Sequence, residues 1–172
     1  MYPSIIGITG YAQNGKDSIG DVLIEHFGYT RIALADPLKE MARAIGWNGT
    51  KDDGPPCKCC GMLQGRPLLQ KMGTEAIRNH LGPDIWVRNV LRLMEYDKRY
   101  VITDVRFPNE ASILHQNGAR IWRVYRDGFG VGKNHASEAS IDEIYQDTSF
   151  FNNGSLEDLE KVVLDHMKYY DM

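Results

Sequence analysis

The sequence predicts an α/β domain of three layers, in which helices cover both faces of a central parallel sheet. Two observations support this prediction. Short apolar runs typical of buried strands alternate along the chain with longer segments whose apolar residues recur at helical spacing. Charged and polar residues follow several of these runs, and the carboxyl ends of parallel strands form the edge where α/β domains bind ligands.

The first apolar run, residues 4–9, leads into a glycine-rich loop with the spacing Gly10-x-x-x-x-Gly15-Lys16. A helical pattern of apolar residues that extends to Phe27 follows the loop. Strand, loop and helix in this order are typical of a P-loop, in which backbone N–H groups and a helix N-terminus surround the phosphates of a nucleotide. The candidate nucleotide-binding residues are Gly10, Tyr11, Ala12, Gln13, Asn14, Gly15, Lys16, Asp17 and Ser18.

The residue after Lys16 departs from the usual P-loop, in which a Ser or Thr hydroxyl ligates Mg²⁺. This chain has Asp17 there, and the hydroxyl follows at Ser18. A carboxylate is also a hard oxygen ligand, so Asp17 holds the metal directly, holds it through water, or leaves it to Ser18. The alternative interpretation is a glycine-rich turn without a nucleotide, in which Asp17 and Ser18 cap the helix.

The remaining elements follow in chain order. Further strands are predicted at residues 29–34, 100–104 and 119–125. Further helices are predicted at residues 36–45, 68–81, 85–94, 109–117 and 156–169, the first of which has Pro37 in its first turn. Glycine, proline and polar residues predict loops at residues 47–65, 127–138 and 147–155.

The composition fits one compact domain with room for a substantial core, because the chain has 172 residues with a formal net charge of -3. This charge gives no general attraction to nucleic-acid backbones or anionic membranes, so the basic residues are expected to gather at a local phosphate site. The sequence shows no secretory leader pattern and no apolar run near the ~18 residues that span a bilayer. We therefore expect a cytoplasmic protein.

Three cysteines lie within four residues, as Cys57-Lys58-Cys59-Cys60. Their odd number argues against a secreted disulfide framework. A Zn²⁺ site would need a fourth ligand such as His80, and adjacent cysteines rarely direct both sulfurs to one tetrahedral centre. Reduced thiols in a loop are the favoured interpretation, with a structural metal as the alternative.

Acidic residues follow two of the predicted strands. Asp36 comes soon after residues 29–34 with Lys39 nearby, and Asp104 ends the strand at residues 100–104. P-loop enzymes commonly place an acid near Mg²⁺ at such a strand end, whereas the alternative for Asp104 is a helix or turn cap. Trp86 follows a Gly-Pro-Asp turn and either stacks on a base or packs in the core.

Phosphoryl transfer between two nucleotides requires several positive charges, because it gathers many phosphates and stabilises charge on the transferring group. Lys16 alone is too little for this. Guanidinium groups suit bidentate phosphate contacts, although each arginine taken singly is better explained as a solvated surface charge. The candidate cations in or beside predicted loops and short helices are Arg66, Arg78, Arg106, Arg126 and Lys133.

Taken together, these motifs resemble those of the phage-type deoxynucleoside monophosphate kinases. The resemblance spans roughly residues 4–160, and the order and spacing of the motifs carry it. The motifs are Gly10 to Ser18, Asp36-Pro37-Leu38-Lys39, Leu69-Gln70-Lys71-Met72-Gly73-Thr74-Glu75 with Arg78, Asp84-x-Trp86, Asp104-Val105-Arg106-Phe107-Pro108-Asn109-Glu110 and His135-Ala136-Ser137-Glu138.

The resemblance implies a single P-loop kinase domain over residues 1–172, with an acceptor-binding region at about 36–98 and a lid at about 126–138. Residues 47–65 would be an insertion outside the family pattern. The implied reaction moves the γ-phosphoryl group of ATP to a deoxynucleoside monophosphate, with Mg²⁺, and gives ADP and the diphosphate. The partners are thus small nucleotides, with no nucleic-acid polymer and no membrane.

The resemblance also implies site residues. Catalytic roles would fall to Lys16, Asp104, Arg106 and Arg126, and metal contacts to Asp17, Ser18 and Asp104. The acceptor would lie against Asp36, Lys39, Arg66, Gln70, Thr74, Arg78, Trp86, Arg106, Glu110 and Glu138.

Two other functions stay open at this stage. One is a P-loop kinase of another phosphorylated acceptor, such as a mevalonate phosphate or dephospho-coenzyme A. The other is an ATP-binding switch protein that hydrolyses slowly and signals through a partner. The sequence also leaves the oligomeric state open, with a homodimer as one candidate, and a phage-encoded chain would act in the host cytoplasm.

Overall fold

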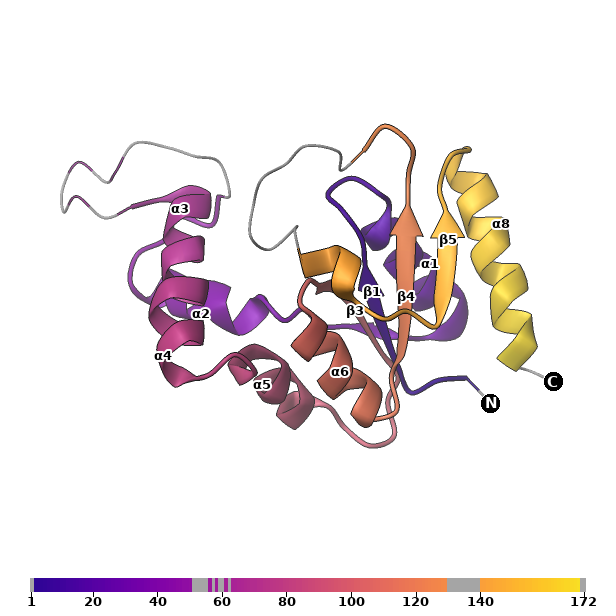
Figure 1. Ribbon diagram of the computed structural model, residues 1–172, viewed down its shortest axis with the longest axis horizontal. Coiled ribbons are helices and arrows are strands. Elements are labelled where there is room, and N and C mark those ends of the chain that lie inside the picture. The colour runs from indigo at the N-terminus through magenta and orange to yellow at the C-terminus, as the bar shows by residue number, and fades with distance from the viewer. Residues whose placement is uncertain are drawn as a thin grey trace. The chain divides into compact units, whose positions relative to one another are not determined.

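A computed structural model describes residues 2–50, 56, 58, 61, 63–129 and 140–170 (Figure 1). The chain divides into two compact units. One consists of Met1–Ala33 together with Leu93–Met172, and the other of Leu34–Arg92. The predicted lid residues 130–138 and the thiols of Cys57, Cys59 and Cys60 lie outside the described residues.

A five-stranded parallel sheet forms the first unit, and its strands follow the order β2-β3-β1-β4-β5. The central position of β1 places the loop that follows it between the carboxyl ends of β3 and β4. The predicted parallel α/β sheet is therefore confirmed. Its strands are β1 (Ile5–Thr9), β2 (Thr30–Arg31), β3 (Tyr100–Val105), β4 (Arg120–Tyr125) and β5 (Thr148–Phe151).

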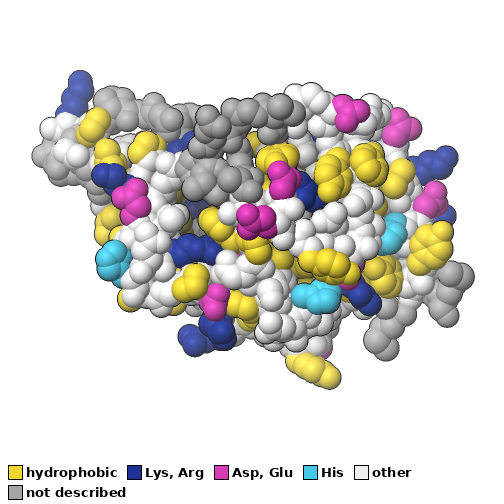
Figure 2. All heavy atoms as spheres, viewed as in Figure 1, with side chains coloured by type: hydrophobic (Ala, Val, Ile, Leu, Met, Phe, Trp, Pro, Cys, Tyr) yellow, Lys and Arg dark blue, Asp and Glu magenta, His cyan; other side chains and the backbone are white. Residues whose placement is uncertain are grey.

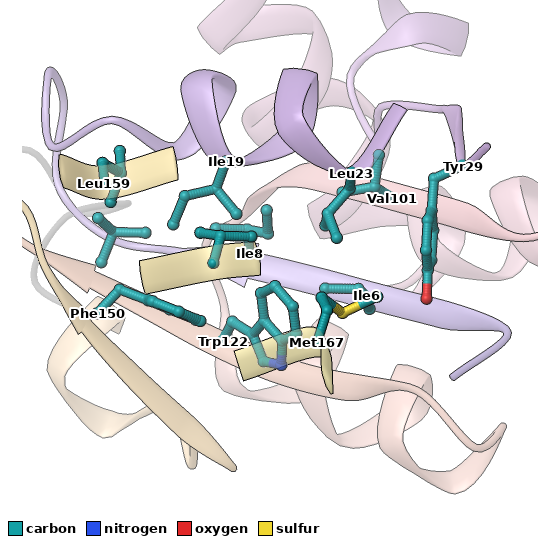
Figure 3. Close-up of a cluster of buried hydrophobic side chains, with 12 residues drawn as sticks. Ile6, Ile8, Ile19, Leu23, Tyr29, Val101, Trp122, Phe150, Leu159 and Met167 are labelled. Atoms are coloured by element: carbon teal, nitrogen blue, oxygen red, sulfur yellow. The ribbon is translucent and has the colours of Figure 1, made fainter. Parts of the chain in front are cut away.

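Helices cover both faces of this sheet. On one face, α1 (Lys16–Phe27) and α8 (Leu156–Met167) pack over β1, β4 and β5. Figure 3 shows Ile19 projecting from α1 toward Ile8, and Trp122 lying between Phe150 and Met167. The Trp122 and Phe150 ring centroids are 5.0 Å apart. Burial of these apolar side chains supplies the main stabilisation of the unit.

The opposite face of the sheet carries α6 (Pro108–Gln116). Gly7 of β1 makes this packing close, because a Cβ atom there would lie 2.9 Å from Ile121 Cδ1 and 3.2 Å from Val105 Cγ2. The same Cβ would meet Leu114 of α6 at 3.4 Å. The three layers predicted from the sequence are thus present in this unit.

Helical segments form the second unit. The predicted helix at residues 68–81 is confirmed, but its middle is a π-helix, a form that occurs often at functional sites. Gly73 in this π-helix allows close packing on α2, because a Cβ atom there would lie 2.6 Å from Leu38 Cδ2. The segments are α2 (Asp36–Ala44), α3 (Gly65–Gln70), the π-helix (Lys71–Arg78), α4 (Asn79–Leu81) and α5, which runs from Ile85 to Leu93.

Two predicted element boundaries were wrong. The predicted loop at residues 147–155 contains β5, which escaped notice because it has four residues and only Phe150 is buried. The strand predicted at residues 29–34 shortens to the two residues of β2, and Asp36 begins α2 shortly afterwards. Short 3₁₀ helices at Ser140–Glu143 and Lys168–Tyr170 were not predicted either.

Charged side chains are spread over the surface. Figure 2 shows basic side chains in separate patches among acidic and apolar ones on the face viewed. This distribution agrees with the small net charge of -3. No helix among the described ranges is long and apolar enough to span a bilayer.

His166 on α8 makes the stability of the core depend on pH. Its ring packs half-buried against Trp122 and Phe150, at centroid distances of 5.2 and 5.4 Å, and burial lowers its pKa. The unfolded chain takes up a proton at this residue near the ordinary histidine pKa of about 6.5, while the folded chain resists protonation. Stability is therefore lost as the pH falls below that value.

We expect the unfolding free energy of the wild-type protein to fall as the pH drops from about 7.5 to about 5.5. Replacing His166 with Gln should flatten this dependence, because the titrating group is removed. Denaturant unfolding followed by circular dichroism at several pH values measures the slope. His80→Gln, at an exposed position, is the matched control, and equal slopes in all three proteins would contradict the prediction.

Candidate functional site

The loop from Gly10 to Gly15 joins β1 to α1 at the carboxyl edge of the sheet (Figure 1). Gly10, Gln13 and Gly15 have positive φ angles of 143°, 66° and 100°. Such residues interrupt the usual backbone path and turn successive N–H groups toward one concave side, which favours anions. Gly15 precedes α1 and has no side chain to cap the helix, so the first N–H groups of α1 also suit an anion.

Close packing holds the buried end of this loop. A Cβ atom at Gly10 would lie 2.6 Å from the Val124 carbonyl oxygen, and one at Gly15 would lie 2.4 Å from Asn152 Nδ2. Asn14, 1 % exposed, donates its side-chain amide to the Val124 carbonyl at 2.9 Å. Asn152 donates to the Asn14 carbonyl at 2.9 Å. Both glycines are therefore required by space as well as by backbone conformation.

Two of the predicted catalytic residues, Lys16 and Arg126, donate hydrogen bonds to backbone carbonyl groups of the loop. Lys16 Nζ donates to the Tyr11 carbonyl at 2.7 Å. Arg126, just after β4, donates to the Gln13 carbonyl at 3.4 Å, and its guanidinium carbon lies 4.5 Å from the centroid of the Phe129 ring. The structure thus brings Lys16 and Arg126 together at the loop, and their catalytic roles stay predictions.

Asp17, in the first turn of α1, belongs to a polar cluster. Its Oδ1 accepts hydrogen bonds from the Thr103 hydroxyl at 2.8 Å and from Arg31. Arg31 also donates to Thr103 Oγ1 at 3.0 Å. Sequence reasoning missed both partners, although each stands at or near the end of a strand, where we expected functional residues. Arg31 partly neutralises the charge of Asp17. The Oδ1 atom of Asp17 is already engaged by Arg31 and Thr103.

The end of β3 departs from regular pairing with β1. Gly7 pairs with Ile102 and Thr9 pairs with Val105, so β3 has one extra residue opposite Ile8. This bulge falls at Thr103 and Asp104, and bulges next to binding sites redirect side chains. Asp104 is half-buried. The bulge therefore includes Asp104, the residue predicted to lie near the metal.

Arg106 and Glu110 follow β3. Arg106 is exposed, whereas Glu110 is 4 % exposed. Glu110 Oε2 accepts from the backbone N–H groups of Arg106 and Phe107 at 3.0 and 3.1 Å, so it caps the start of α6. Its predicted contact with the acceptor stays a prediction.

Apart from Glu138, the other predicted acceptor residues lie in the helical unit. Asp36 and Lys39 form an ion pair of 2.8 Å. Arg78, at the end of the π-helix, is buried, with 9 % of its surface exposed. Arg66, Gln70 and Thr74 precede it at four-residue intervals and are exposed.

Trp86 packs inside the same unit. It is 8 % exposed, and its indole N–H donates to the Gly73 carbonyl at 3.1 Å. This contact joins α5 to the π-helix and gives Trp86 a packing role. Stacking of Trp86 on a base stays a prediction, as does the role of Glu138, which lies outside the described residues.

The residues present suit a nucleotide with a metal. The concave loop, the open start of α1 and Lys16 match a polyphosphate. Ser18, Asp17 and Asp104 supply the hard oxygen atoms that Mg²⁺ prefers. Within the described part of the chain, no group of three His, Cys, Asp or Glu residues forms a metal cage.

Comparison with known proteins identifies relatives that cover most of the chain. The sequence model of the deoxynucleotide monophosphate kinase family matches residues 62–163. A provisionally named deoxynucleotide monophosphate kinase of Acanthamoeba polyphaga mimivirus is 25 % identical, over 93 % of this chain and 94 % of that protein. The deoxynucleotide monophosphate kinase of Escherichia phage RB69 is 32 % identical over 55 % of this chain, which aligns with 41 % of the phage protein. The deoxynucleotide monophosphate kinase of Enterobacteria phage T4 is 30 % identical over 60 % of this chain, which aligns with 45 % of that phage protein.

Two solved structures with the same fold are kinases. Shikimate kinase from Aquifex aeolicus superposes with a TM-score of 0.60 at 13 % identity and covers 98 % of both chains. Dephospho-CoA kinase from Campylobacter jejuni gives a TM-score of 0.52 at 11 % identity over 96 % of both. At these identities the likeness establishes the P-loop kinase fold alone. Because the family match spans more than half of the chain, this protein belongs to the deoxynucleotide monophosphate kinase family and is an ATP-dependent phosphotransferase.

Proposed function

We propose that this protein transfers the γ-phosphoryl group of ATP to a deoxynucleoside 5′-monophosphate, with ADP and a deoxynucleoside diphosphate as products. The geometry of the loop carries the proposal, since residues 10–15 form a glycine-rich loop with three positive φ angles, and Lys16 and Arg126 lie against its carbonyl groups. Membership of the deoxynucleotide monophosphate kinase family supports the choice of acceptor.

On the donor side, we assign the ATP phosphates to residues 10–18. Lys16 would exchange the neutral Tyr11 carbonyl for the anionic transferring group, a stronger charge-assisted partner. Arg126 would exchange the Gln13 carbonyl in the same way. Bound Mg²⁺ would neutralise charge on the β- and γ-phosphates, and Ser18, Asp17 and Asp104 are the residues that would hold it.

On the acceptor side, we assign the monophosphate to the helical segment from Arg66 to Arg78. Arg66 and Arg78 supply guanidinium groups, and Gln70 and Thr74 supply neutral hydrogen-bonding groups between them. Asp36 and Lys39 would complete this side, and Arg106 would bridge donor and acceptor.

The chemistry needs little proton transfer. The attacking acceptor phosphate is already anionic at neutral pH, so charge stabilisation and positioning do most of the work. We therefore assign no general base. Residues 126–138 are proposed as a lid that excludes water, so that ATP is not hydrolysed instead.

The first test of the proposal is ADP formation from Mg·ATP with dAMP, dGMP, dCMP, dTMP, AMP or GMP offered separately. We expect turnover that depends on a deoxynucleotide and exceeds that of a control without acceptor. Turnover equal to the control would contradict the proposal and favour an ATP-hydrolysing switch protein. Turnover only with a non-nucleotide phosphorylated acceptor would favour a different kinase of the same fold.

Replacing Lys16 with Met should lower kcat by at least about 100-fold, because it removes a charge that acts on the transition state. Steady-state kinetics with saturating acceptor measures this loss. Lys168→Met is the matched control, since Lys168 is exposed and pairs with Asp165 at 2.6 Å. Near wild-type turnover by Lys16→Met would exclude the loop as the phosphoryl-transfer site.

Replacing Arg78 with Gln should raise the KM for the acceptor about tenfold or more, with the KM for ATP nearly unchanged. The reason is the loss of a bidentate phosphate contact on the acceptor side only. Arg92→Gln, at an exposed arginine of α5, is the control. A rise confined to the KM for ATP would move Arg78 to the donor side, and thermal melting shows whether the variant is folded.

A further inference from the structure

A buried arginine on β4 has no assigned role in the reaction. The Arg123 side chain is 6 % exposed. Its guanidinium donates to the Ile141 carbonyl at 3.1 Å and to the Asp142 carboxylate, and it lies 4.8 Å from the centroid of the Tyr125 ring. These contacts fix the 3₁₀ helix Ser140–Glu143 against the sheet.

Asp142 connects this arginine to the glycine-rich loop. Its Oδ1 accepts from Arg123, and its Oδ2 accepts from the Tyr11 hydroxyl at 2.6 Å. The hydrogen bond from Tyr11, followed by that from Arg123, lowers the pKa of Asp142. Asp142 therefore stays ionised at neutral pH, and both hydrogen bonds are charge-assisted.

Tyr11 is the point where this network meets the phosphate-binding loop. The buried end of the loop is fixed by Asn14 and Asn152, whereas Ala12 and Gln13 are exposed. Tyr11 immediately precedes the exposed residues Ala12 and Gln13, and its carbonyl accepts from Lys16 Nζ at 2.7 Å. The hydrogen bond from the Tyr11 hydroxyl to Asp142 therefore restrains the exposed residues Ala12 and Gln13. It also restrains the carbonyl that Lys16 contacts.

We propose that Asp142 and Arg123 are positioning residues for the P-loop. They hold Tyr11, so that the backbone N–H groups of the loop are arranged before ATP arrives. A loop that is ordered in advance loses less conformational freedom on binding, and this raises affinity without any new contact to the ligand. The inference rests on the proposed function in one respect, since it takes the loop as the ATP-phosphate site.

The test measures the Kd of Mg·ATP for the full chain by isothermal titration calorimetry. Tyr11→Phe removes only the hydroxyl, and Asp142→Ala removes its acceptor. Each should raise the Kd roughly threefold to tenfold, as expected for one hydrogen bond. The KM for the acceptor should stay within about twofold, which separates loop positioning from a general loss of structure.

A double-mutant cycle tests the connection itself. Tyr11→Phe combined with Asp142→Ala should raise the Kd no further than the larger single effect, because both changes break the same bond. The matched controls are Tyr145→Phe and Glu143→Ala, which remove one hydroxyl and one carboxylate at exposed positions near Asp142 in the sequence and should leave the Kd unchanged. Arg123→Lys should act like Asp142→Ala, since one ammonium cannot reproduce both guanidinium contacts.

The outcomes separate this inference from the proposed function. An unchanged Kd in Tyr11→Phe, or additive effects in the double variant, would overturn the positioning role. If the wild-type protein binds Mg·ATP but phosphorylates no deoxynucleotide, the proposed reaction fails and the Kd comparison still decides the positioning role. If Asp142→Ala or Arg123→Lys is unfolded by thermal melting, Tyr11→Phe and its control decide alone.

Discussion

The close packing of the glycine-rich loop against the ends of β4 and β5 is the constraint on which the rest of the site depends. Neither Gly10 nor Gly15 has space for a side chain, because the Val124 carbonyl and the Asn152 amide occupy that space. This contact fixes where α1 begins, and the start of α1 determines where Lys16 and Asp17 stand. The chemistry of the site thus follows from a steric condition in the sheet.

Local patterns in the sequence predicted much of the fold but less of the site. The spacing Gly10-x-x-x-x-Gly15-Lys16 indicated the phosphate-binding loop, because all the residues that form such a loop are close together in the sequence. The strand β5 was missed because one buried residue in four gives no periodic signal. The π-helix was missed because its hydrogen-bond register leaves no mark in residue spacing. The contacts of Arg31 with Thr103 and of Asp142 with Tyr11 were missed because these partners lie far apart in the sequence.

The two compact units divide the proposed roles between them. Residues assigned to ATP lie in the unit with the sheet, and all but three of those assigned to the acceptor lie within Leu34–Arg92, a single insertion between β2 and β3. The exceptions are Arg106 and Glu110, which follow β3, and Glu138. A change of acceptor could therefore arise within one continuous segment, while the loop and its supports on the sheet stay the same. This arrangement fits a fold that also serves shikimate kinase and dephospho-CoA kinase.

The supports of the loop come from distant parts of the chain. Tyr11 and Asp142 are 131 residues apart, and Asn14 and Asn152 are 138 residues apart. Contacts of such high sequence separation form only after long chain segments have been ordered, which makes them slow to assemble. A chain released before β5 has been synthesised would have the whole glycine-rich motif but lack Asn152. The ability to bind nucleotide is therefore expected late in folding, and it reports on the completeness of the sheet.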